Sequence, residues 1–156
     1  MKITKSTLVY NLVCNAPISF VLSLAGALLA SPRINWINFS LNFALSFFLA
    51  MLIGLFLPLT AIGRSFTALF HVENKTYAFN PTYRLLATFS GTVIFFFIIS
   101  PCLSILNYFL IPGQSVNVVL FNFFRNLPFL FFVDFTATLL SDYPAYHLAH
   151  SLDPTF

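Results

Sequence analysis

The chain has 156 residues, of which 59% are hydrophobic and only 7% are charged. Soluble domains contain about 25% charged and about 45–50% apolar residues, so this composition excludes an ordinary water-soluble globule and a disordered chain. Seven Lys and Arg against four Asp and Glu give a net charge of +3. This excess of basic residues is too small for a nucleic-acid-binding surface. We therefore expect the lipid bilayer to be the main partner of this chain.

Four apolar stretches are each long enough to cross a membrane, since a spanning helix needs about 20 residues. They cover about residues 6–30, 36–62, 85–111 and 116–140. Their continuous apolar runs and the Pro, Gly and Asn residues between them are typical of membrane helices and turns. The sequence predicts an all-α integral membrane protein with four transmembrane helices in a single domain, residues 1–156.

The distribution of Lys and Arg predicts the orientation, because cytoplasmic loops carry the excess of these residues. With the N-terminus inside, Arg33 and Arg125 lie outside or near the outer face. Five basic residues then lie in the cytoplasm, including those of a loop over residues 64–84: Lys2, Lys5, Arg64, Lys75 and Arg84. We expect both termini to be cytoplasmic, with a short amphipathic tail, residues 143–156, on the membrane surface.

A sequence pattern recurs in the second and fourth stretches. The pattern Asn-Phe-x-x-Asn-x-x-x-x-Phe-Phe begins at Asn38 and again at Asn122. It suggests two tandem helical hairpins, residues 6–64 and 85–142. Because each hairpin has two helices, both copies enter the membrane from the same side and form a parallel pseudo-repeat about an axis along the membrane normal.

Small and amide side chains recur every four residues in the predicted helices, which keeps each row on one side of its helix. One interpretation is a set of helix-packing faces, since such residues stabilise helix association in lipid. The other is a wet seam lined by asparagines, the candidates being Asn15, Asn38, Asn42, Asn122 and Asn126.

The fourth stretch carries two charged residues, Arg125 and Asp134. An ionisable residue inside a membrane helix is costly and suggests a functional role. The two are about 13.5 Å apart along a straight helix and point in opposite directions, so they do not pair there. We expect Arg125 to reach the outer headgroups and Asp134 to face the interior, as a hydrogen-bonded structural group or as a proton or cation site.

Catalytic signatures are weak in this chain. We find no glycine-rich phosphate loop and no nucleophile–base pair at a readable spacing. His147 and His150 lie three residues apart, but two imidazoles without a clear third ligand are poor evidence for a metal. We expect a protein that is not an enzyme and that uses no cofactor and no metal.

The first hairpin, about residues 10–70, resembles a family of short bacterial two-helix membrane proteins with no assigned function. In that family the second helix opens with a tryptophan and closes at a proline followed by basic residues. The corresponding residues here are Asn35-Trp36, Pro58 and Arg64. The resemblance implies a duplicated hairpin in a bacterial cytoplasmic membrane, and it implies no activity.

The second hairpin matches that family less well, because residues 83–148 lack the tryptophan and carry Asp142 where the first hairpin has its proline. Two functions remain open. The first is a non-enzymatic accessory or interaction protein, with a membrane-protein partner or a second copy of itself. The alternative is a small oligomeric transporter or channel with an Asn-lined seam and Asp134 as its proton or cation site.

Overall fold

The computed structural model describes residues 4–30, 33–57, 59–72, 80–110 and 115–154, which form helices and no strands. Four of these helices are long and apolar enough to cross a membrane, and α3 is a short helix between the second and third of them. The prediction of a helical multi-pass membrane protein is therefore confirmed. The helices within the described residues are α1 (Lys5–Ala30), α2 (Trp36–Phe56), α3 (Leu59–Ala68), α4 (Pro81–Leu110) and α5 (Val116–Leu152).

The second apolar stretch is divided between two helices, whereas the sequence predicted one helix over residues 36–62. α2 ends at Phe56, and Leu57 is extended, with φ −90° and ψ 137°. A proline follows Leu57 in the sequence, and the residue before a proline is sterically driven out of the helical region. α3 then forms a separate helix that packs on α4.

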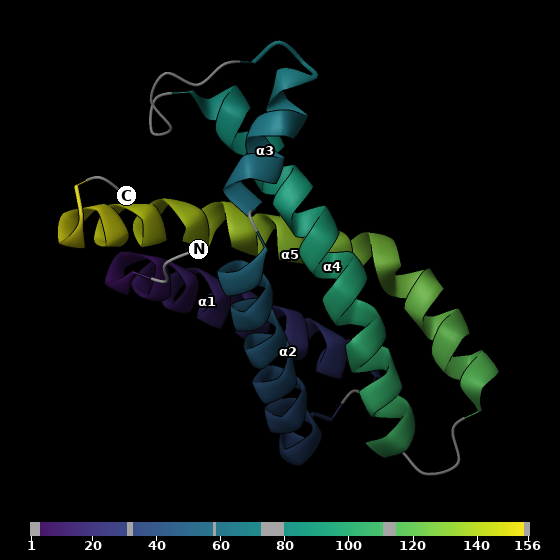
Figure 1. Cartoon of the computed structure of the whole chain (residues 1–156). Helices are drawn as coiled ribbons and strands as arrows, with labels where there is room; N and C mark the ends of the chain where they lie inside the picture. Colours follow the sequence, from purple (N-terminus) through teal and green to yellow (C-terminus); the bar gives the residue numbers. More distant parts are fainter. Residues whose placement is uncertain (1–3, 31–32, 58, 73–79, 111–114, 155–156) are drawn as a thin grey trace.

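α5 is longer than predicted, since it continues past residue 140 to Leu152. Residues 143–152 of the predicted surface tail therefore form the last turns of this helix, and residues 155–156 lie outside the described part of the chain. α5 bends in its first half (Figure 1), where Pro128 lies inside the helix. A proline there removes one backbone donor and kinks the helix. Beyond the bend, α5 runs alongside α1, which is the most extensive helix contact in the fold.

α1 and the second half of α5 cross α2 and α4 steeply (Figure 1). The beginning of α1 and the end of α5 lie close together at the left of the view, and α3 lies at its top. The starts of α2 and α5 lie at the opposite end. The two described ends of the chain therefore lie near each other.

Two small clusters form the core. Leu22, Ala50, Ile53 and Ile99 bring α1, α2 and α4 together. Cys14 and Ile18 of α1 pack with Ala145 of α5 in the second. In two parallel repeats, the α1–α5 and α2–α4 contacts would be equivalent, but the first is much more extensive than the second. The tandem repeat therefore stays a prediction.

Candidate functional site

The polar row of α1 is a packing face. Asn11, Asn15, Ser19 and Ser23 are all buried. The side-chain amide of Asn15 donates to the backbone carbonyl oxygen of Ala50 in α2 at 3.3 Å. The hydroxyl groups of Ser23 and Ser46 lie 3.3 Å apart across the same interface. These polar groups are satisfied by the neighbouring helix, so Asn15 is placed in a helix contact and not beside a water-filled space.

Gly54 permits the close approach of α1 and α2. A Cβ atom added at Gly54 would lie 1.8 Å from Oδ1 and 2.8 Å from Cγ of Asn11. Asn11 is itself held in place, because its amide donates to the Thr7 carbonyl oxygen at 2.8 Å and its Oδ1 accepts from Asn15 at 3.4 Å. A residue without a side chain is therefore required at this crossing.

The other predicted asparagines are half-buried and do not gather around Asn15. Asn42 donates to the Asn38 carbonyl oxygen within α2, at 2.9 Å. Asn122 and Asn126 lie in the first half of α5, before the bend. Within the described part of the chain their side chains form no hydrogen bond. The predicted seam residues are thus spread over three helices. Asn15, the one in α1, belongs to the contact between α1 and α2.

Arg125 and Asp134 lie in different environments, as the sequence predicted. Arg125 is exposed, whereas Asp134 is 2% exposed. The Asp134 carboxylate has no side-chain hydrogen bond or ion pair among the described residues, and only its backbone carbonyl oxygen accepts, from Thr138 at 2.8 Å. Asp134 is therefore a buried acidic group with no polar partner that would give it a structural role.

A polar cluster that the sequence analysis missed joins α1, α4 and α5. The Asp142 carboxylate accepts from the Tyr10 hydroxyl at 2.5 Å and forms an ion pair with Arg84, whose Nε lies 3.3 Å from Oδ2. Arg84 also donates to the Leu139 carbonyl oxygen at 2.6 Å and lies 5.0 Å from the centre of the Tyr143 ring. This cluster fixes the end of the helical assembly near the chain termini.

One signal in the sequence pointed to this cluster. Asp142 follows Asp134 by about two helical turns, so the two carboxylates lie on similar sides of one helix. The sequence analysis instead placed Asp142 at the end of the second hairpin, just before the surface tail, and Arg84 at the end of the cytoplasmic loop. Loop and tail are brought together only because α5 remains helical beyond residue 140.

The two histidines near the end of α5 contact aromatic rings. His147 lies 4.3 Å from the Tyr143 ring centre, and His150 stacks on Tyr146 with the ring centres 5.7 Å apart. Among the described residues, no three His, Cys, Asp or Glu side chains gather in a way that could hold a metal ion. The structure thus pairs each histidine with a tyrosine ring of the same helix.

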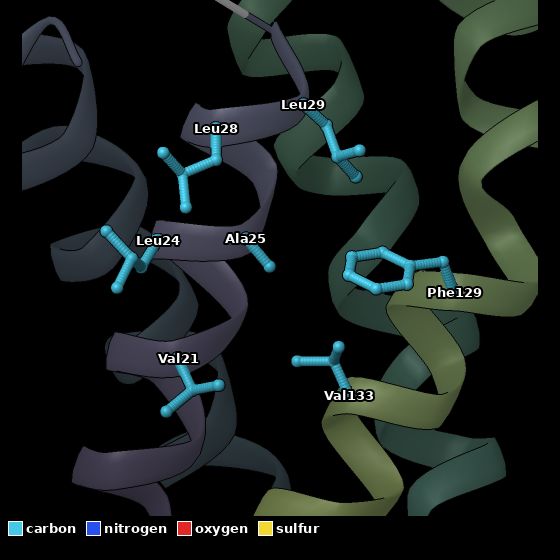
Figure 2. A pocket seen from close by; sticks show the side chains of 7 residues that line it. All are labelled: Val21, Leu24, Ala25, Leu28, Leu29, Phe129 and Val133. Atoms are coloured by element: carbon cyan, nitrogen blue, oxygen red, sulfur yellow. The ribbon is translucent and has the colours of Figure 1, made fainter. Parts of the chain in front are cut away.

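An apolar groove lies between the second half of α1 and the part of α5 that follows its bend. Figure 2 shows side chains from the two helices facing each other across this space. Its volume is about 300 Å³, and it contains no charged or amide lining residue. The lining residues are Val21, Leu24, Ala25, Leu28, Leu29, Phe129 and Val133.

Comparison with known protein families, with curated proteins and with solved structures finds no match to this chain. Its function must therefore be inferred from its own residues. Three features stand out: the buried polar face of α1, the buried carboxylate of Asp134, and the first half of α5, which includes Asn122 and Asn126 and has no buried residue before Asp134.

Proposed function

We propose that this chain is a non-enzymatic accessory protein of the bacterial cytoplasmic membrane that binds another membrane helix. The surface that binds this partner is the first half of α5. The partner is another membrane protein or a second copy of the chain. Both termini lie in the cytoplasm, a placement supported by the excess of Lys and Arg near the N-terminus and between the second and third apolar stretches.

The observation that carries this proposal is the contrast between the two halves of α5. All of its buried residues lie from Asp134 onward. In the first half, Phe121 and Phe124 are 65% and 66% exposed, while Asn122 and Asn126 have no side-chain hydrogen bond within the described chain. Amide groups in lipid are stabilised by hydrogen bonds to another helix. A partner helix would supply those bonds and cover this half of α5.

Site-specific photo-crosslinking tests the proposal. A photoreactive amino acid replaces Phe124 in α5 or, as the matched control, Phe48 in α2, which is 59% exposed. We expect one discrete crosslinked protein from position 124 in native membranes and only lipid adducts from position 48. Asn126→Leu should weaken the crosslink several-fold without lowering the thermal midpoint. The proposal is wrong if positions 124 and 48 give the same products.

A second function, proton or cation transport, is favoured by Asp134 alone. A carboxylate that is 2% exposed and has no side-chain partner in the described chain is costly to keep in a membrane helix unless it serves a purpose. Purified protein in proteoliposomes would then carry a proton or cation flux that Asp134→Asn abolishes. Phe132→Leu, at an exposed position of the same helix, serves as a control. Flux equal to that of empty vesicles would reject this alternative.

A further inference from the structure

The groove between α1 and α5 opens toward the surrounding membrane. Four of its lining side chains are exposed: Val21, Leu28, Leu29 and Phe129. Ala25 and Val133 line its inner part (Figure 2). The shape follows from the fold, because the bend in α5 carries its first half away from α1 beyond this point. The groove is thus an elongated apolar space between two helices, at the end of the molecule away from the chain termini.

The charged side chains near the open end of this groove are basic. Arg125 precedes Phe129 by four residues, about one helical turn, and lies on the other side of the bend near Pro128. Arg125 is exposed. Arg33 follows α1 at the same end and is exposed as well. Within the described chain, every acidic residue lies at Asp134 or beyond it, and so further from this end of α5.

From this juxtaposition we propose that the groove binds an acyl chain of an anionic phospholipid whose phosphate group contacts Arg125. The lining accepts a hydrocarbon chain and offers nothing to a polar ligand. The guanidinium group supplies planar, charge-assisted hydrogen bonds to phosphate oxygens. This inference goes beyond the proposed function, because it concerns a lipid held between α1 and α5. It assigns Arg125, which lies in the same half of α5 as the partner surface, to the lipid headgroup and not to the partner helix.

The selectivity of this site comes from the headgroup. Lipid tails are as apolar as the groove, so burying one acyl chain barely distinguishes one phospholipid from another. The interaction of Arg125 with a phosphate group that carries net negative charge does distinguish them, because zwitterionic headgroups bring a second, positive group next to the arginine. Basic pockets between membrane helices bind anionic headgroups in this way. The site also explains how an arginine in the first half of α5 is accommodated.

Lipid retention in native mass spectrometry tests this inference on the full chain. Protein in detergent is supplied with equal amounts of phosphatidylglycerol and phosphatidylcholine of identical acyl chains. We expect one retained phosphatidylglycerol per chain, preferred about tenfold, and Arg125→Gln should remove that preference. The matched control is Arg64→Gln, which removes an exposed arginine from the opposite end and should leave the preference intact.

A second pair of variants tests the groove itself. Ala25→Phe fills it and should abolish retention of both lipids, whereas Ala44→Phe makes the same change on an exposed face of α2 and should have no effect. Phe129→Ala removes an exposed wall of the groove and should lower retention several-fold, even if Ala25→Phe does not fold.

Three results would overturn the inference. They are equal retention of the two lipids by the unaltered protein, equal losses in Ala25→Phe and Ala44→Phe, or a dimer that Ala25→Phe disrupts, which would assign the groove to a second copy. The crosslink from position 124 is measured in Arg125→Gln as well. Its persistence there separates a failed lipid site from a failed partner site.

Discussion

Replacing Asp142 with leucine is expected to lower the free energy of unfolding by about 2–4 kcal/mol. The same replacement at Asp134 is expected to leave that free energy unchanged or to raise it. The two positions are well matched, because they lie in one helix and are 3% and 2% exposed. They differ in their partners: Asp142 binds Tyr10 and Arg84, whereas the Asp134 carboxylate has no side-chain partner in the described chain.

The expected change in the free energy of unfolding depends on which buried polar groups lose a partner in each substitution. Removing one partner of a buried ion pair costs about 3–5 kcal/mol, because the other charge remains buried. Here the Arg84 side chain is 22% exposed and keeps its bond to the Leu139 carbonyl oxygen and its contact with Tyr143, which lowers the loss to about 2–4 kcal/mol. At Asp134, leucine replaces a desolvated carboxylate and breaks no bond.

The assay is denaturant unfolding of the detergent-solubilised protein, followed by circular dichroism of the helices in identical micelles. A double-mutant cycle that combines Asp142→Leu with Arg84→Met should give a coupling free energy of at least about 1 kcal/mol. The reasoning is refuted if Asp134→Leu destabilises the protein as much as Asp142→Leu does. It is also refuted if the cycle between Arg84 and Asp142 shows no coupling.

Three further predictions concern single sites and use the same unfolding assay. Gly54→Ala should cost about 2–4 kcal/mol, because its Cβ would displace the hydrogen-bonded Asn11 side chain; an unchanged midpoint would show that Asn11 moves freely. Thr92→Val should stabilise the protein by about 1 kcal/mol, since the fully buried Thr92 hydroxyl has no partner in the described chain; destabilisation would reveal a hydrogen bond there. His71→Gly should raise stability by about 0.5–1 kcal/mol, because φ of 55° at the end of α3 suits glycine; a loss of stability would contradict this account of the α3 terminus.

Some of the candidate site was predictable and some was not. The four-residue row of α1 identified a buried face, because a period of four keeps residues on one side of a helix. Whether that face meets another helix or water depends on what lies opposite, and the Ala50 carbonyl oxygen opposite Asn15 decides it. The contact between Arg84 and Asp142 was missed because it joins residues far apart in the chain.

Composition and the lengths of the apolar runs were enough to establish the class of this protein. A bilayer accepts backbone polar groups only when they are bonded within the segment, so four long apolar runs must be helices. A different local rule explains the break after Leu57, where a proline follows, although the sequence analysis predicted one helix over residues 36–62. These conclusions need no knowledge of how one helix meets another.

The pairing of the helices was decided only in three dimensions. Lipid gives no hydrophobic drive for one apolar face to meet another, so helix partners are selected by close packing and specific hydrogen bonds. The contact of α1 with α5 depends on Ala145 and Ala149, which are completely buried, and on the bond from Tyr10 to Asp142. The groove beside that contact exists because α5 bends away from α1 near Pro128, and neither helix specifies that divergence on its own.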